Sequence, residues 1–359
     1  MLRSLSAVTL VAAVIVVATG TGFFLKDLRI GRTIGVGPPL ADEPALVYLD
    51  GPRSRFIVAK LDGLGAREQD VGGTIHSYAV DPSGAHIAAW RANDRDEYEL
   101  VVWRVGGSMT VLLGPTVEFP NGRPVWDSRS SEIAVSLVSL PPPQNRTPTG
   151  SPVSSRILVA PVRGGQPIQV VAFGTDSAPV PVAITNTRVV AFKGDHFVAF
   201  RRVDGVSIED ARIQGLTSYG ADARAGLAFA IVTGGDALSP RQSLSVWPVD
   251  GPYTAARTTD SPTFNAPVVW PGRSEVVFGT GSSLRAFDTT IGVARDLTNE
   301  DTIVMPEAFS PDGDFLVAKR LLAPFLKLYE THGDRVVTTA VNIALPPGAV
   351  HLVGFARTR

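Results

Sequence analysis

Short apolar runs separated by turn residues dominate the chain from residue 45 onward. The clearest example is AFSPDGDFLVAK at residues 308–319, and it has an echo, AVDPSGAHIAAW, at residues 79–90. In each stretch a serine or aspartate opens a four-residue turn, and a glycine closes it where a left-handed backbone is needed. Each stretch therefore predicts a tight hairpin of two apolar strands.

Hairpins of this kind recur along the chain at a regular spacing. Their turns lie near Asp81, Asp127, Thr185, Ala221, Pro271 and Ser310. The turns are about 46 residues apart on average, close to the ~40 to 50 residues of a propeller blade. Further apolar strands follow each hairpin, so the pattern predicts an all-β, seven-bladed β-propeller. Six or eight blades are the alternatives, because the turns at Thr185 and Ala221 are degenerate.

The two ends of this strand-rich region, residues 45–359, complement each other. The last strand, VHLVGFA at residues 350–356, has no outer strands after it, whereas the first strands after residue 45 have no inner strand before them. Pairing the last strand with the first blade would close the ring and leave no unpaired edge at the seam. We therefore expect the propeller to be closed by its own C-terminal strand.

At two turns the sequence resembles the TolB-like, WD-repeat-related propeller family. The matching residues are Phe309, Ser310, Pro311, Asp312 and Gly313 in one blade and Val80, Asp81, Pro82, Ser83 and Gly84 in another. Trp126 and Trp270 stand where that family often places an aromatic residue before the turn. The resemblance covers two blades well and about five loosely, and the fourth and fifth blades depart from it. It implies a rigid interaction platform in the cell envelope, and no catalytic residues transfer with the motif.

The N-terminal segment is long and apolar enough to cross a membrane. Residues 4–25 carry no charge, and a transmembrane helix needs about 20 such residues. We predict a retained signal anchor at residues 1–25. The alternative is a cleaved signal peptide, with small residues at Ala18 and Gly20 near the cleavage point. Small side chains that would let other membrane helices approach closely are Ala12, Ala13, Gly20 and Gly22.

Residues 26–44 lack helical or strand periodicity and contain three prolines, so they predict a linker. Orientation can be argued both ways. Lys26, Arg29 and Arg32 follow the apolar segment, and the positive-inside rule would then place the propeller in the cytoplasm. The very short N-terminal tail and the cysteine-free, proline-rich body favour export. We predict a single-pass protein of the inner membrane with its propeller on the periplasmic side.

Composition narrows the range of functions. The 359 residues carry a net charge of -1 with a pI of about 6.5, which offers no bulk attraction to nucleic acid. Charged residues make up 19%, and there are 35 glycines and 28 prolines, as expected for many short strands joined by turns. The absence of cysteine excludes disulfides, thiolate chemistry and a lipid-modified cysteine anchor.

No sequence motif predicts a catalytic or cofactor site. The chain lacks GxSxG, GxxxxGK[ST], HExxH and a GxGxxG after a strand. The five histidines are scattered one to a blade without the HxH or HxxxH spacing of a metal site. Asp94 and Asp96 are weak candidates for calcium, since carboxylates alternate there. No glycine makes the sharp ligand loop, and Arg95 lies between them, so a solvated turn is the favoured interpretation.

Two segments are candidates for binding a partner protein. Residues 140–153 contain five prolines and predict a stiff, extended arm; the alternative is a tolerated surface insertion. Residues 320–328 run apolar without alternation, which predicts either an interface or the folded-back tip of a long hairpin. The candidate contact residues are Pro141, Pro142, Pro143, Arg146, Leu321, Leu322 and Phe325.

These features together predict a non-catalytic binding or scaffolding subunit of a larger bacterial membrane complex, with respiratory or photosynthetic assemblies among the possibilities. Its expected partners are membrane protein subunits, with the lipid bilayer contacted through residues 4–25, and we expect no cofactor. Two alternatives remain open. One is a calcium-dependent hydrolase or lactonase that uses the propeller channel, and the other is a soluble periplasmic sensor released by cleavage at Gly20.

Overall fold

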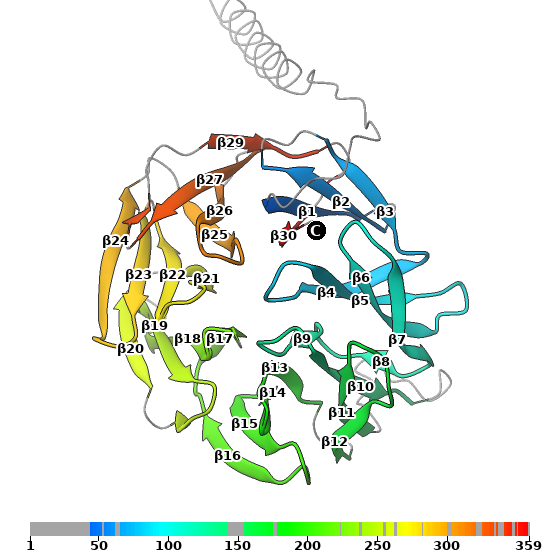
Figure 1. Cartoon of the computed structure of the whole chain (residues 1–359). Coiled ribbons are helices and arrows are strands. Elements are labelled where there is room, and N and C mark those ends of the chain that lie inside the picture. The colour runs from blue at the N-terminus through cyan, green and yellow to red at the C-terminus, as the bar shows by residue number, and fades with distance from the viewer. Residues whose placement is uncertain are drawn as a thin grey trace, which may run out of the picture. The chain divides into compact units, whose positions relative to one another are not determined.

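The computed structural model describes residues 44–357, apart from 52–53, 62–64, 142–153, 175–177, 223, 237–238, 254–255, 262–263, 282, 300–302, 321–324, 334, 337–340, 347–348 and 350. Seven β-sheets stand around a central axis in this part of the chain (Figure 1). The predicted all-β, seven-bladed propeller is confirmed. Among these residues no helix has the length and hydropathy of a membrane span. The predicted anchor at residues 1–25, with Ala12, Ala13, Gly20 and Gly22, and most of the linker lie outside the described residues.

Blade 1 combines the two ends of the propeller sequence, and blades 2 and 3 follow it. Blade 1 contains β1 Pro44–Asp50, β2 Arg55–Lys60, β3 Arg67–Asp70 and β30 His351–Arg357. Blade 2 contains β4 Thr74–Val80, β5 His86–Ala92, β6 Tyr98–Arg104 and β7 Met109–Thr116. Blade 3 contains β8 Phe119–Pro120, β9 Val125–Trp126, β10 Glu132–Ser139, β11 Ser154–Pro161 and β12 Ile168–Phe173. Its innermost strand is split, because β8 and β9 both pair with β10.

Blades 4 to 7 repeat the same antiparallel order. Blade 4 contains β13 Val180–Ile184, β14 Arg188–Lys193, β15 His196–Arg201 and β16 Ser207–Arg212. Blade 5 contains β17 Leu216–Asp222, β18 Leu227–Asp236, β19 Ser239–Pro248 and β20 Arg257–Ser261. Blade 6 contains β21 Asn265–Val269, β22 Glu275–Thr280, β23 Ser283–Asp288 and β24 Val293–Asn299. Blade 7 contains β25 Val304–Phe309, β26 Phe315–Arg320, β27 Phe325–His332, β28 Arg335–Val336 and β29 Val341–Ala344.

The first and last strands of the ring lie side by side. β30 pairs antiparallel with β1, with Ala45 opposite Ala356 and Leu46 opposite Phe355. A strand at residues 350–356 is predicted in this position from the sequence. The resulting order β3-β2-β1-β30 gives blade 1 four strands from opposite ends of the sequence.

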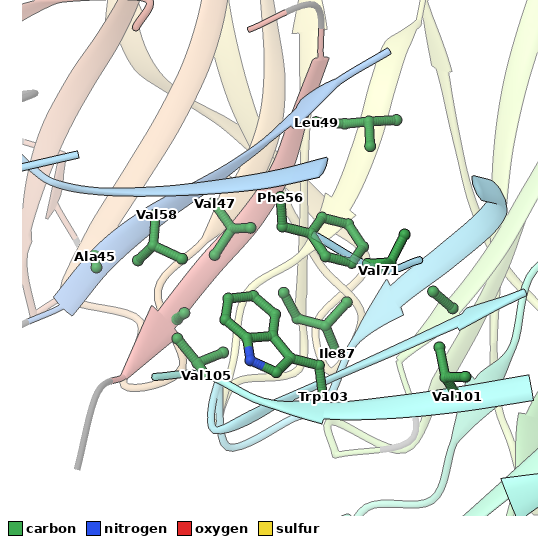
Figure 2. Packing of buried hydrophobic residues seen from close by; sticks show 12 residues of the cluster. Ala45, Val47, Leu49, Phe56, Val58, Val71, Ile87, Val101, Trp103 and Val105 are labelled. Carbon is green, nitrogen blue, oxygen red and sulfur yellow. The ribbon is translucent and has the colours of Figure 1, made fainter. Parts of the chain in front are cut away.

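Hydrophobic clusters fill every seam between neighbouring blades. The buried apolar residues fall into seven clusters, and each combines residues of two adjacent blades, including one that joins blade 7 to blade 1. Between blades 1 and 2, for example, Phe56 stacks on Trp103 with ring centroids 5.8 Å apart (Figure 2). A blade is therefore a sheet with both faces covered by its neighbours.

Burial on both faces explains the apolar runs in the sequence. Along β1, Val47 and Leu49 pack toward blade 2, whereas Leu46 and Tyr48 pack toward blade 7. Alternate residues of a strand point to opposite faces, so a strand covered on both faces is apolar at every position. The outermost strands lack such cover at their edge and are more exposed, as the burial patterns of β7 and β12 show. In β3, with the sequence REQD, every residue is polar.

The turns between the first and second strands of blades 2 and 7 are stabilised by the same backbone hydrogen bond. In blade 2 the Gly84 amide donates to the Asp81 carbonyl at 2.9 Å, and in blade 7 the Gly313 amide donates to the Ser310 carbonyl at 2.9 Å. We call the side of the ring that carries these turns the turn face. Because the strands alternate in direction, the connections between second and third strands lie on the other side, the far face.

Candidate functional site

A channel runs between the innermost strands of the seven blades. It has a volume of about 550 Å³, and residues of β4, β9, β13, β17, β21, β25 and β30 or the adjoining turns line it. Its charged lining residues are Asp81, Asp222, Glu307, Arg123 and Arg224. A cavity of this size is in the range of small-molecule sites, so the channel is the first candidate for a ligand-binding or active site.

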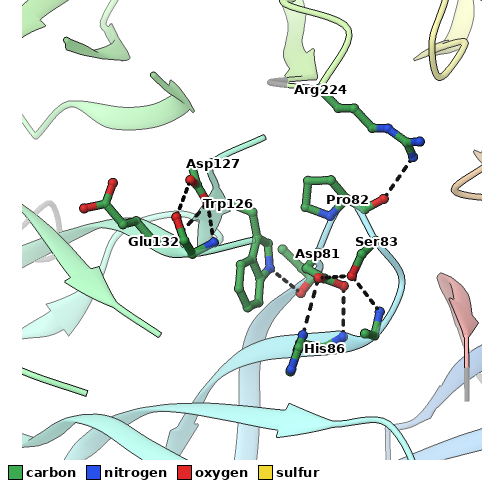
Figure 3. Close-up of polar contacts among 11 residues, drawn as sticks. Asp81, Pro82, Ser83, His86, Trp126, Asp127, Glu132 and Arg224 are labelled. Carbon is green, nitrogen blue, oxygen red and sulfur yellow. Dashed lines mark hydrogen bonds and ion pairs between the residues drawn. The ribbon is translucent and has the colours of Figure 1, made fainter. Parts of the chain in front are cut away.

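Two of the three channel carboxylates are engaged in their own turns. Asp81 accepts hydrogen bonds from the His86 amide at 2.9 Å and from the Ser83 hydroxyl at 2.5 Å (Figure 3). Asp222 accepts the Ala225 amide at 2.8 Å, and burial raises its pKa. These carboxylates hold the backbone of two blades, which is a structural role.

Glu307 is the channel carboxylate with no turn to stabilise. Its partial burial raises its pKa, and the charges of Lys319 and His351 oppose that shift. The described residues contain no group of three histidine, aspartate or glutamate side chains that could hold a metal ion. Although three carboxylates line one channel, they do not form the converging ligand set that calcium needs.

Tyr219 is the phenol in the channel lining, and Tyr78 directly precedes the lining residue Ala79. Tyr219 stacks on Phe192 with ring centroids 4.1 Å apart. Burial raises the pKa of Tyr78 and of Tyr219, and the charge of Glu307 raises that of Tyr78 further. The positive charge of Arg123 opposes this rise in both phenols without cancelling it. Neither phenol is therefore prepared to lose its proton near neutral pH, and neither is suited to act as a base.

Arg224 ties three blades together at the turn-face mouth of the channel. It lies in the turn after β17, and its Nη1 donates to the carbonyl oxygen of Pro82 at 3.1 Å (Figure 3). The same Nη1 also donates to the carbonyl oxygen of Pro311. These residues belong to blades 5, 2 and 7. Sequence analysis missed this contact, since its three residues are far apart and no local pattern distinguishes Arg224 from other turn arginines.

The two tryptophans singled out by the sequence link neighbouring blades at the turn face. Trp126 Nε1 donates to the Ala79 carbonyl at 3.0 Å, from blade 3 to blade 2. Trp270 Nε1 donates to the Gly313 carbonyl at 3.2 Å, from blade 6 to blade 7. Both indoles are buried, so each satisfies its only donor while it fills a seam.

The candidate calcium ligands Asp94 and Asp96 lie in the exposed connection between β5 and β6. Asn93 organises this turn, because its side-chain oxygen accepts the amides of Arg95 at 2.9 Å and Glu97 at 3.0 Å. Asp96 has a φ of 57°, which a turn position requires. Among the residues that the structure describes, the two aspartates belong to no group of three acidic or histidine side chains that could hold a metal ion.

The histidines do not converge on one point. His76 and His86 share blade 2, so the expected distribution of one to a blade is wrong at this pair. His86 contacts Asp81, and His196 lies between Asp195 and Asp210 on blade 4. His76, His86, His196 and His332 each contact a side chain of their own blade.

The predicted partner-binding residues fall on the far face or outside the described residues. Pro141 lies two residues after the end of β10, whereas Pro142, Pro143 and Arg146 lie outside the described residues. Phe325 begins β27, where it is half-buried and opposite Ala344. Leu321 and Leu322 also lie outside the described residues. The two segments are alike in position, because each connects the second and third strands of its blade.

An exposed apolar and aromatic patch lies beside the start of the proline-rich segment. We call His76, Tyr98, Val117, Phe119 and Leu140 the aromatic patch. The Tyr98 ring lies 4.9 Å from the His76 ring and 5.4 Å from the Phe119 ring, centroid to centroid. Phe119 is 40% exposed, Val117 83% and Leu140 39%. Sequence analysis missed this patch, because its residues come from two blades.

Comparison with known proteins identifies the fold only. No protein-family model matches the sequence, and no curated protein matches it. The structure is similar to an oligogalacturonate lyase in complex with manganese, with a TM-score of 0.55 and 12% identity over 87% of this chain and 92% of that chain. It is also similar to a chain of a mitotic checkpoint complex, with a TM-score of 0.52 and 11% identity over 79% of this chain and 82% of that chain.

TolB from Acinetobacter baumannii matches with a TM-score of 0.46 and 14% identity over 90% of this chain and 68% of that chain, which is too weak to support an argument. At such identities a likeness shows a shared fold and no shared activity. The resemblance to TolB-like and WD-repeat-related propellers is confirmed in this sense: the chain is a β-propeller, and its role has to be argued from its own surfaces.

Proposed function

We propose that this chain is a non-catalytic binding or scaffolding subunit that is anchored in the inner membrane and presents its propeller on the periplasmic side. The observation that supports a binding role most is the aromatic patch. Its exposed apolar side chains adjoin Pro141, where the proline-rich segment begins. Contiguous exposed apolar surface is unfavourable in water and usually marks an interface.

The partner that fits this surface is a protein with an apolar contact region, such as another subunit of a membrane complex. Aromatic and aliphatic side chains dominate the buried centre of protein interfaces. Next to the patch, Glu118 is neutralised by an ion pair with Arg156 and accepts the Ser139 hydroxyl at 3.2 Å. The aromatic patch therefore resembles the apolar centre of an interface, and the adjacent Glu118–Arg156 ion pair resembles part of its polar rim.

The rigid ring suits this role. Seven filled seams and the Arg224 contacts hold the blades in fixed relative positions, so surface residues from different blades keep their geometry. Membrane anchoring through residues 4–25 would raise the local concentration of the partner, so that weak contacts suffice.

The direct test is purification of the tagged full-length chain after gentle detergent extraction, with mass spectrometry of the proteins that accompany it. The Val117→Ser/Phe119→Ser variant should lose the accompanying protein. The matched control is Val203→Ser/Ile291→Ser, which replaces side chains that are 84% and 68% exposed in the connections after β15 and β23, on the turn face. Equal recovery of partners with both double variants would refute the proposed surface.

Two further variants test the segments predicted from the sequence. Deletion of residues 141–152 should weaken the same association if the proline-rich segment is a docking arm. Leu322→Ser/Phe325→Ser should leave thermal stability nearly unchanged if these side chains bind a partner. A large loss of stability would show instead that they belong to the core of blade 7.

The location is tested separately. Protease added to intact spheroplasts should digest the propeller if it lies on the periplasmic side, and full protection would place it in the cytoplasm. The mass of the purified intact protein distinguishes a retained anchor from a cleaved signal peptide. Neither result bears on the aromatic patch, so the two parts of the proposal can fail independently.

A further inference from the structure

A second cavity lies on the turn face, away from the aromatic patch. Its volume is about 690 Å³, and its walls come from the turns of blades 2 and 3 with contributions from blades 5, 7 and 1. Five arginines line it: Arg104, Arg129, Arg163, Arg224 and Arg357. We call this cavity the arginine groove. Its volume is in the range of pockets that hold small molecules.

The groove concentrates positive charge on a protein whose net charge is close to zero. Asp312 is the single carboxylate residue in its lining, and Arg357 already pairs with it. The whole chain carries a net charge of -1. Five guanidinium groups around one concave surface produce a local positive potential that attracts anions.

Three of the five guanidinium groups are uncommitted. The side chains of Arg104, Arg129 and Arg163 are exposed, and no hydrogen bond or ion pair joins them to any residue that the structure describes. Arg224 differs, because it donates to two backbone carbonyls. Each free guanidinium presents five N–H donors in a planar fork that matches the oxygens of a carboxylate or phosphate.

The backbone that carries the free arginines is firmly held. The Val105 amide, next to Arg104, donates to the Ala85 carbonyl at 2.9 Å. The Val162 amide, next to Arg163, donates to the Ser131 carbonyl at 2.9 Å. These equivalent bonds tie the outer hairpin of each blade to its inner turn.

Arg129 is held by its own turn. Asp127 accepts the Ser131 amide at 2.6 Å and the Glu132 amide at 3.0 Å, and the Ser130 amide donates to the Asp127 carbonyl at 3.2 Å. The three arginines thus stand on fixed backbone around one cavity, so little backbone entropy would be lost when an anion binds.

We propose that the arginine groove binds a small molecule that carries two or more carboxylate or phosphate groups. Several separated guanidinium groups require several anionic groups on the ligand, because one oxyanion cannot reach them all. The volume suits a small ligand, and the fork geometry suits carboxylate and phosphate alike. This site is on a different face from the aromatic patch, and it does not depend on the proposed scaffolding role.

Isothermal titration calorimetry of the purified full-length chain at low ionic strength tests the groove, with citrate and pyrophosphate as probes. The test variant is Arg104→Gln/Arg163→Gln. The matched control, Arg95→Gln/Arg257→Gln, removes two exposed arginines that are not in the groove. Circular dichroism and thermal unfolding should show that both variants fold as the unsubstituted chain does.

The unsubstituted chain should bind at least one probe at a single site, and added salt should weaken the binding. Each lost charge-assisted contact is expected to cost about tenfold in affinity, so the groove variant should bind about 100-fold more weakly. The control should stay within about threefold. Absence of binding by both probes to the unsubstituted chain, or equal losses in the two variants, would overturn the proposal.

Discussion

Replacement of Asp127 by alanine should destabilise the propeller, although this residue lines neither the channel nor the arginine groove. Asp127 directly follows β9, part of the inner strand of blade 3, and is 6% exposed. Its carboxylate accepts the Ser131 amide at 2.6 Å, the Glu132 amide at 3.0 Å and the Ser131 hydroxyl at 2.7 Å. The alanine variant loses all three bonds, while the backbone bonds of the turn can remain.

The size of the effect follows from these contacts. A hydrogen bond to a charged group contributes about 1.5 to 3 kcal/mol, and the contributions of neighbours are not additive. Ser131 is exposed, so water can replace the hydroxyl contact, whereas the two amides lose a partner that holds the turn. We therefore expect the free energy of unfolding of Asp127→Ala to fall by about 2 to 4 kcal/mol.

Urea denaturation followed by tryptophan fluorescence measures this change, since the chain has 5 tryptophans and all lie in the core. The slope of the free energy against urea should be unchanged. Asp94→Ala, in an exposed turn, is the control and should change stability by no more than about 0.5 kcal/mol. A loss below about 1 kcal/mol for Asp127→Ala, or equal losses in both variants, would refute the structural role of the turn aspartate.

Further predictions concern ring closure and pH. Phe355→Ala should lower the free energy of unfolding by about 3 to 5 kcal/mol, because this buried side chain joins blade 1 to blade 7; a loss within about 0.5 kcal/mol would contradict this. Burial alone would raise the pKa of Asp312, but hydrogen bonds and Arg357 lower it. Its stabilising contribution is present above the unfolded pKa and lost as pH falls, so Asp312→Asn should flatten stability against pH below about pH 4 in urea titrations. Glu307 has a raised pKa in the folded protein, so its ionisation destabilises the fold. Glu307→Gln should therefore raise the free energy of unfolding at neutral pH, and its advantage over the unsubstituted chain should shrink as the pH falls. An unchanged pH profile of stability in Asp312→Asn or in Glu307→Gln would contradict the assigned contacts.

Much of the fold could be predicted because its local signals are strong. Strands covered on both faces are apolar throughout, as the run PALVYLD at Pro44–Asp50 shows, and they stand out from the polar turns. The turns at Asp81 and Ser310 carry their own chemistry, since a polar first residue and a later glycine with positive φ fix the reversal. The regular spacing of such turns then gives the number of blades.

The irregular parts of the fold carried no such signal. The inner strand of blade 3 is split into β8 and β9, and Gly122 lies between them with a φ of 87°. Gly122 also approaches Val180 of blade 4 so closely that an added Cβ would lie 2.5 Å from Val180 Cγ1. That contact is made between blades. The sequence around Gly122 indicates a turn, and nothing in it indicates the close contact with blade 4.

The two surfaces proposed to bind ligands or partners were the least predictable from sequence. The arginine groove gathers Arg104, Arg163 and Arg357 from three blades, and the aromatic patch gathers Tyr98 and Phe119 from two. Such groups exist only after the ring has formed. No spacing rule within the chain links residues that meet through the closure of seven repeats.

Ring closure by the two ends of the propeller is the claim on which both surfaces depend, and a cysteine pair tests it most directly. Ala45 and Ala356 are buried partners in the β1–β30 register, and the chain has no cysteine of its own. In the Ala45→Cys/Ala356→Cys variant we expect mild oxidation of the folded protein to form a disulfide, so that neither cysteine is alkylated after the oxidised protein is unfolded in denaturant, as measured by intact mass. Alkylation of both cysteines in the oxidised and then unfolded protein would contradict the closed ring.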